Sequence, residues 1–121
     1  MDRLKVLVVD DESRMRKLVK DFLLRQNYEV LEAENGEEGI QKYKEENPDM
    51  VTMDITMPVK DGLEALKEIK NFDSAAKVIM VTAAGQESKV MEAVKLGAAE
   101  FVTKPFEKEK IVDTVHKVVN N

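Results

Sequence analysis

The segment KVLVVDD, residues 5–11, is an apolar run that ends in two acidic side chains, Asp10 and Asp11. The apolar part predicts a short buried strand. Burial does not account for the acidic pair, because aspartate is almost never fully buried unless it has a partner. The segment therefore predicts a strand with a polar site at its carboxyl end.

Two later apolar runs also end in a charged residue. DMVTMD, residues 49–54, ends in Asp54, and EFVTK, residues 100–104, ends in Lys104. If these runs and the first one are neighbouring parallel strands, three carboxylates and one ammonium group meet at a single edge of a sheet. Such a set favours a site for a metal ion and a phosphoryl group.

Strand-like runs alternate with segments of helical apolar spacing, five times in succession. The runs cover residues 4–9, 28–33, 49–54, 77–82 and 99–103. The third and fourth are apolar at nearly every position, as a strand covered on both faces requires. This alternation predicts an α/β fold with a parallel sheet, in which ligands bind beyond the carboxyl ends of the strands.

Helical segments are indicated by apolar stripes and by residues that favour helix ends. Asn35 and Asp61 each precede a glutamate by three positions, the capping-box spacing of a helix start, and Gly97 favours a helix end. The stripes after the first and last runs are predicted to face the core. They comprise Met15, Leu18, Val19, Phe22 and Leu23 in the first and Ile111, Val112, Val115, Val118 and Val119 in the last.

Length and composition favour one globular domain over residues 1–121, with 43% hydrophobic and 36% charged residues. There is no cysteine, which excludes disulfides and thiolate metal sites. A net charge of −5 disfavours nucleic acid as a partner. The sequence has neither a long apolar stretch nor a secretory leader, so we expect a cytoplasmic protein that acts on partner proteins and not on membranes.

A crowded acidic site is stabilised by a bound cation. Two carboxylates in contact repel by about 4 kcal/mol at an effective dielectric constant of about 20. Mg²⁺ relieves this repulsion because it prefers oxygen ligands and bridges carboxylates to phosphoryl oxygens. Phosphoryl transfer depends largely on positioning and electrostatics, which a cation, an ammonium group and a hydroxyl supply.

The motifs VLVVDDE, MDITMP, VTAAG and FVTKPF resemble those of response-regulator receiver domains, of the single-domain CheY type, and the resemblance covers essentially the whole chain. It implies a flavodoxin-like (βα)5 three-layer sandwich with a five-stranded parallel sheet in the order 2-1-3-4-5. It also implies that Asp54 accepts a phosphoryl group from the phosphohistidine of a sensor histidine kinase or phosphotransfer protein. Thr82 would donate its hydroxyl to a phosphoryl oxygen, and Lys104 would pair with another.

By the same resemblance, the carboxylates of Asp10, Asp11 and Asp54 and the backbone carbonyl of Thr56 would bind Mg²⁺, with Mn²⁺ as an alternative. Only the carbonyl of Thr56 would matter, so its side chain would be free to vary. The bond from Lys104 to the following proline is left open by the sequence: it is trans by default, or cis as in the family, which would aim the lysine into the site.

The resemblance also indicates which residues transmit the signal. Thr82 and Phe101 would form the switch, and Met15 and Leu18 would contact the kinase. Packing in the core is the alternative for the last three of these. The output partner would be a protein, such as a flagellar motor switch in chemotaxis, and a phosphatase could reset the signal. We expect a monomer that is not a turnover enzyme.

Other interpretations remain open from the sequence. The chain could be a phosphorelay intermediate or a receiver from a longer regulator. It could be a small aspartyl-phosphate hydrolase with Asp10 as the nucleophile, or a binding module that is never phosphorylated. Taken singly, Asp10 could be a helix cap, Asp54 a turn residue, Lys104 a solvated lysine and Thr82 a packing residue.

Overall fold

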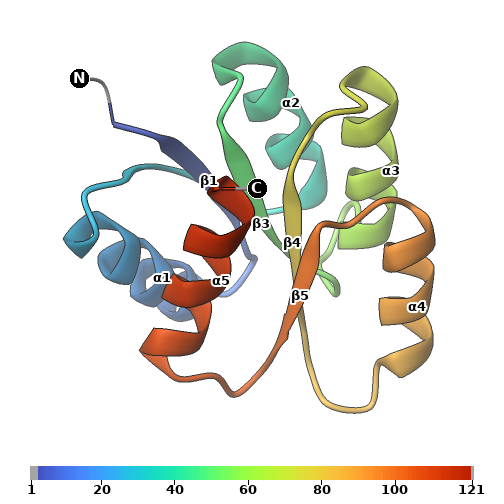
Figure 1. The fold of residues 1–121 in the computed structure, drawn as a ribbon. Coiled ribbons are helices and arrows are strands. Elements are labelled where there is room, and N and C mark those ends of the chain that lie inside the picture. Colours follow the sequence, from blue (N-terminus) through green and yellow to red (C-terminus); the bar gives the residue numbers. More distant parts are fainter. Residues whose placement is uncertain (1–2, 121) are drawn as a thin grey trace.

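A computed structural model describes residues 3–120, in which five strands alternate with five helices (Figure 1). Within this part of the chain, no helix is both long enough and apolar enough to cross a membrane. The elements are β1 (Lys5–Val9), α1 (Ser13–Arg25), β2 (Glu29–Ala33), α2 (Gly36–Glu46), β3 (Met50–Asp54), α3 (Gly62–Phe72), β4 (Val78–Thr82), α4 (Glu87–Lys95), β5 (Glu100–Thr103) and α5 (Lys108–Val119).

The strands form one parallel sheet in the order β2-β1-β3-β4-β5. This confirms the flavodoxin-like (βα)5 arrangement that the sequence predicts. Every strand begins one residue later than its apolar run suggests, because the first position of each run belongs to the preceding loop. All residues of β3 and β4 are buried, as expected for strands covered on both faces.

Two separate apolar clusters lie on opposite faces of the sheet, because successive strand residues point to opposite sides. In β1, Val6 and Val8 pack with residues of α1 and α5. Leu7 and Val9 pack on the other face, with residues of α2, α3 and α4. Figure 1 shows the three layers that result, with α1 and α5 on one side of the sheet and the other helices opposite.

The predicted helix boundaries are confirmed at three positions. The side chain of Asn35 accepts a hydrogen bond from the backbone N–H of Glu38 at the start of α2. Asp61 accepts one from Glu64 at the start of α3. After α4, Gly97 has a φ of 99°, and Ala98 N–H donates to the carbonyl of Ala93, a Schellman-type helix end.

The predicted apolar stripe of α5 is correct, while that of α1 is wrong at one position. Ile111, Val112, Val115 and Val118 are buried, and Val119 packs partly against them. In α1, Leu18 is 42% exposed, although Val19 and Leu23 are buried. The reason is angular: each residue turns the helix by about 100°, so Leu18 lies at the margin of the stripe that Val19 centres.

Candidate functional site

The register of the strands brings the predicted site residues to one edge of the sheet. Val9 pairs with Met53, and Asp54 pairs with Val81, so β1, β3 and β4 end at similar heights. The backbone N–H of Lys104 donates to the carbonyl of Thr82 at 2.7 Å, which places the end of β5 beside the end of β4. Charged residues from distant parts of the chain therefore lie at the carboxyl edge of neighbouring strands.

Asp10, Asp11 and Asp54 form an acidic cluster at this edge. Each offers a carboxylate oxygen, and these oxygens lie within 4.8 Å of one another. Asp10 and Asp54 are buried, while Asp11 is exposed. The cluster is thus a set of oxygen donors that is open on one side, which suits a hard divalent cation that retains some of its water.

Lys104 supplies the positive charge of the site. Its Nζ lies 3.5 Å from Oδ2 of Asp10 and 3.6 Å from Oδ2 of Asp54. The lysine is mostly buried, unlike a solvated surface lysine, and the bond from Lys104 to Pro105 is cis. The ammonium group therefore lies between the two buried carboxylates and partly offsets their repulsion.

The pKa of Asp54 is raised to about 6, and burial of the carboxyl group is the main cause. The negative charge of Asp10 raises this pKa further, while Lys104 opposes the shift. Burial also raises the pKa of Asp10, against a hydrogen bond from Glu12 and the charge of Lys104. At about pH 7 Asp54 is still mostly ionised, so it can serve as a nucleophile without a general base.

Asp10 is fixed by contacts on both its backbone and its side chain. Its N–H donates to the carbonyl of Ala33 at 3.1 Å, which extends the pairing of β1 with β2. Its Oδ1 accepts from the N–H of Glu12 at 2.9 Å. Glu12, and not Asp10, holds the N-cap position of α1. A capping role alone therefore does not account for Asp10.

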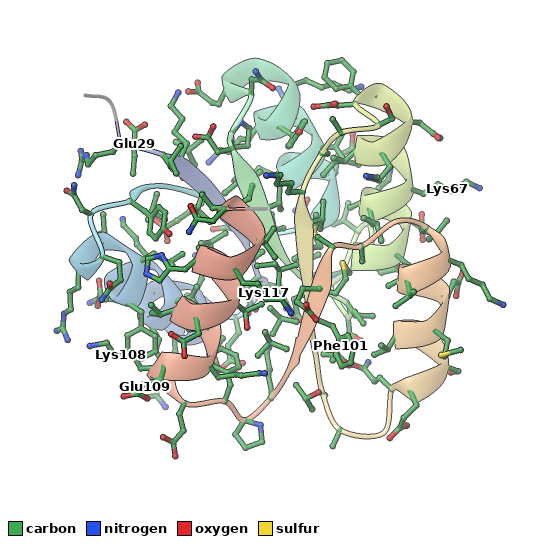
Figure 2. All side chains as sticks on the ribbon, viewed as in Figure 1. Glu29, Lys67, Phe101, Lys108, Glu109 and Lys117 are labelled. Atoms are coloured by element: carbon green, nitrogen blue, oxygen red, sulfur yellow. The ribbon has the colours of Figure 1, made fainter. Side chains whose placement is uncertain are left out.

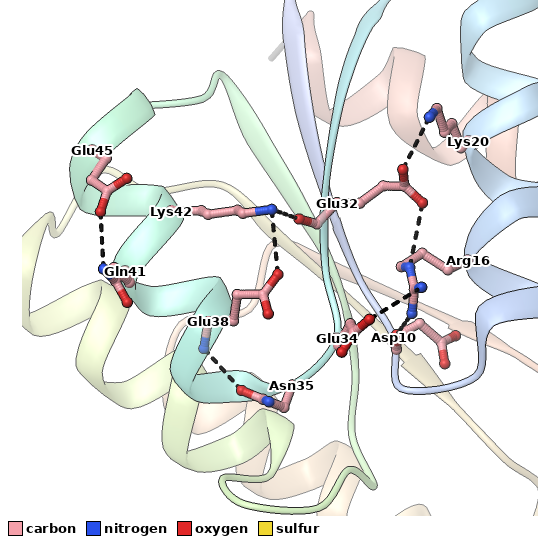
Figure 3. A network of polar contacts seen from close by, with 10 residues as sticks. All are labelled: Asp10, Arg16, Lys20, Glu32, Glu34, Asn35, Glu38, Gln41, Lys42 and Glu45. Carbon is pink, nitrogen blue, oxygen red and sulfur yellow. Dashed lines mark hydrogen bonds and ion pairs between the residues drawn. The ribbon is translucent and has the colours of Figure 1, made fainter.

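Arg16 of α1 supports the end of β1, as Figure 3 shows. Its Nη1 donates to the carbonyl of Asp10 at 2.8 Å, and its Nε donates to Glu32 at 3.3 Å. The pKa of Glu32 is lowered, chiefly by a hydrogen bond from Lys20, to which the guanidinium of Arg16 adds. Arg16 was not predicted from the sequence. The only indication there is that a cationic residue follows shortly after an acidic pair.

Thr82 lies at the end of β4, and its hydroxyl is occupied by Gln86. The Thr82 side chain is buried, and its Oγ1 lies 3.0 Å from Oε1 of Gln86 and 3.0 Å from the carbonyl of Ala83. Gln86 Nε2 also donates to Oγ1 of Thr56 at 2.7 Å. The Thr56 hydroxyl thus has a partner, while the expectation that its side chain is free to vary stays a prediction. Gln86 carried no signal in the sequence.

Phe101 lies on β5 beside α4 (Figure 2), and its side chain is 42% exposed. Packing of Phe101 in the core, the alternative considered from the sequence, is therefore wrong. The ring borders a hollow of about 270 Å³ that Thr82, Val90 and Met91 also line. Phe101 and Thr82 thus share one space, although they lie on different strands.

Met15 and Leu18, the predicted kinase contacts, lie on α1. Met15 is half-buried against the core, and Leu18 is exposed. Because α1 begins at Ser13, its first turn lies close along the chain to Asp11. Leu18 is thus available to a partner from the second turn of α1, while Met15, in the first turn, offers only part of its surface.

Comparisons with known proteins agree with this geometry. The sequence pattern of the response regulator receiver domain matches residues 6–116. The chemotaxis protein CheY of Bacillus subtilis is 48% identical over 96% of this chain and 98% of its own length. CheY of Thermotoga maritima is 49% identical over 94% and 96%, respectively. The receiver domain of NtrX from Brucella abortus has a TM-score of 0.92 at 28% identity, covering 96% of this chain and 98% of its own. The chain belongs to the response regulator receiver family.

Proposed function

We propose that this protein is a phosphorylation-dependent switch in which Asp54 accepts a phosphoryl group from a phosphohistidine. The observation that carries the proposal is the convergence of Asp10, Asp11, Asp54 and Lys104 at one edge of the sheet. A buried carboxylate with a raised pKa, next to both a cation and further acids, is a typical functional carboxylate. The donor would be a sensor histidine kinase or a phosphotransfer protein, as membership of the family implies.

In the proposed step, a carboxylate oxygen of Asp54 attacks the phosphorus of the phosphohistidine. The new P–O bond forms as the P–N bond breaks, and the imidazole leaves with the electron pair and takes up a proton. Lys104 is near enough to Asp54 to pair with an oxygen of the transferred group. Thr82, on the adjoining strand, would donate its hydroxyl to another. These groups stabilise charge that lies on the phosphoryl oxygens in the transition state.

The acidic cluster fits a divalent cation with hard oxygen ligands. The carboxylates of Asp10, Asp11 and Asp54 would hold Mg²⁺, or Mn²⁺ in its place, together with the backbone carbonyl of Thr56. When bound, the cation supplies the positive charge that lets a negative acceptor meet a negative donor. Without the cation, the raised pKa values of Asp10 and Asp54 indicate that the ionised carboxylates are electrostatically unfavourable at this site.

We further propose a CheY-like role in chemotaxis, with all 121 residues forming one receiver that acts as a monomer in the cytoplasm. The two CheY relatives named above are chemotaxis proteins, and this chain covers nearly their full length. Phosphorylation would draw Thr82 toward Asp54. Phe101 could then turn into the hollow that it shares with Thr82 and α4. Leu18 and Met15 would contact the kinase, and an output protein such as a flagellar motor switch would read the altered surface. A phosphatase could then reset the switch.

Incubation with acetyl phosphate and Mg²⁺, followed by intact-mass measurement, tests the phosphoacceptor role. We expect one added phosphoryl group on the native chain and none on Asp54→Asn. Asp113→Asn is the matched control, because Asp113 is an exposed aspartate on α5, outside the acidic cluster. Loss of labelling in the control as well, or its retention in Asp54→Asn, would contradict the proposal.

The same incubation separates the switch from a hydrolase. A hydrolase would release many equivalents of phosphate per chain, and replacement of its nucleophile, Asp10, would abolish that turnover. We expect instead a single phosphorylation event that depends on Asp54 and decays without rapid turnover. Sustained phosphate release that requires Asp10 would favour the hydrolase.

A further inference from the structure

Gln86 connects the two loops that border the acidic cluster. It holds the N-cap position of α4, but its side chain makes no cap bond to that helix. Its side chain turns back instead, with Oε1 accepting from the N–H of Ala83 at 2.8 Å. Its Nε2 donates to Oγ1 of Thr56, 30 residues away in the loop after β3. One amide group thus joins the β3–α3 loop to the β4–α4 loop.

The chemistry of these groups determines how the amide of Gln86 is oriented. A backbone N–H can only donate, so the atom facing Ala83 must be the amide oxygen. The same oxygen lies 3.0 Å from Oγ1 of Thr82, and it can only accept. The single hydroxyl proton of Thr82 is therefore directed at Gln86 or at the carbonyl of Ala83. In either case this proton already has an acceptor within the β4–α4 loop.

We propose that Gln86 is a positioning residue that restrains the hydroxyl of Thr82 in the unphosphorylated protein. This inference rests on the proposed phosphoacceptor function, in which Thr82 must donate to a phosphoryl oxygen. Thr82 cannot make that donation while its proton is held by the loop. Phosphorylation therefore requires that this loop contact, to which the Gln86 amide contributes together with the carbonyl of Ala83, be exchanged for a contact to the phosphoryl group.

This exchange gives Gln86 a measurable effect on the rate of phosphorylation. A contact present in the ground state and lost in the transition state slows the reaction by its net free energy. A hydrogen bond of this type contributes about 1 kcal/mol, which corresponds to about a fivefold change in rate. Removal of the Gln86 amide should therefore speed phosphorylation, whereas a stronger acceptor should slow it.

Two variants at this position separate the proposed restraint from a purely structural role. Gln86→Met keeps a long unbranched side chain and removes every hydrogen bond of the amide. Gln86→Glu keeps acceptors for Thr82 and Ala83 and strengthens them by charge, while it removes the donor to Thr56. Ser88→Glu adds the same charge nearby, at an exposed position of α4, and serves as the charge control.

The rate constant of phosphorylation by acetyl phosphate, measured by intact mass with Mg²⁺, gives the first readout. We expect Gln86→Met to react about fivefold faster than the native chain. We expect Gln86→Glu to react more slowly than Ser88→Glu. A role limited to loop stability would move both Gln86 variants in the same direction. That result, or rates within about twofold of the native chain and control, would overturn the proposal.

A second readout does not require phosphorylation. In methyl-labelled threonine spectra of the protein without any phosphoryl donor, the Thr82 signal should shift in Gln86→Met and shift little in Ser88→Glu. An unchanged Thr82 signal would overturn the contact itself. If the signal shifts but no variant, nor the native chain, is phosphorylated, the restraint exists and the proposed phosphoacceptor function fails.

Discussion

Replacement of Asp54 by asparagine should stabilise the metal-free protein. Asp54 is only 8% exposed and lies in one cluster with two other acids. Its attraction to Lys104 at 3.6 Å does not outweigh burial, because the pKa is raised and not lowered. Asparagine has nearly the same shape and carries no charge, so it removes the cost of burying an ionised group.

The magnitude follows from the shift of the pKa of Asp54 from 3.8 to about 6. That rise of the pKa corresponds to about 3 kcal/mol of unfavourable free energy when Asp54 is ionised in the folded state. The folded state binds the proton more tightly than the unfolded state, so this cost is absent below the ordinary pKa. It grows as the pH rises from about 4 to about 6 and is fully present at about pH 7.

Urea denaturation in EDTA, repeated across this pH range, measures the effect. The free energy of unfolding of Asp54→Asn should exceed that of the native chain by up to about 3 kcal/mol at about pH 7. The difference should shrink toward zero at about pH 4, and Mg²⁺ should reduce it at neutral pH by stabilising only the native cluster. Asp113→Asn should show no such pH-dependent difference. An Asp54→Asn protein that is less stable than the native chain at neutral pH would refute the reasoning.

Three further substitutions test other parts of the site. Gly62→Ala should lower the free energy of unfolding by about 2 kcal/mol or more in urea, because its Cβ would lie 2.1 Å from the carbonyl oxygen of Asp54; full stability would contradict the packing. Lys104→Met should raise the pKa of Asp54 further, because the charge of Lys104 lowers that pKa. A carboxyl-carbon NMR titration measures it, and an unchanged or lower pKa would argue against the interaction of Lys104 with Asp54. Arg16→Met should cost about 1–2 kcal/mol in thermal or urea unfolding, more than Lys20→Met, because only Arg16 also donates to the backbone at the end of β1; equal costs would argue against that contact.

The fold could be predicted from the sequence because local signals and burial agree. The runs at residues 50–54 and 78–82 are mostly apolar, and the structure buries all of their positions, including the polar Thr52, Asp54 and Thr82. The acidic edge was predictable for a related reason. Asp54 ends the buried strand β3 and Lys104 directly follows β5, and parallel strands place their carboxyl ends at one edge.

The contacts that tune the site could not be predicted in the same way. Gln86 meets Thr56 across 30 residues, through a side chain whose direction depends on two loops. Arg16 reaches the backbone of Asp10 from a helix surface where a charged residue is usually solvated. The helical spacing predicts Leu18 on the buried stripe, whereas the structure exposes it, because spacing alone does not fix the width of that stripe. Such features depend on tertiary geometry, to which periodicity is insensitive.

The arrangement of hydrogen bonds explains how a change of charge at Asp54 can affect the outer strand. Asp54 attracts the side chain of Lys104, and the backbone N–H of Lys104 is bonded to the carbonyl of Thr82. Thr82 is in turn bonded to Gln86, which also holds the loop that follows Asp54. A phosphoryl group on Asp54 competes for the ammonium of Lys104 and the hydroxyl of Thr82 at once. In the proposed switch, both competitions would act on the ends of β4 and β5, next to the hollow that Phe101 borders.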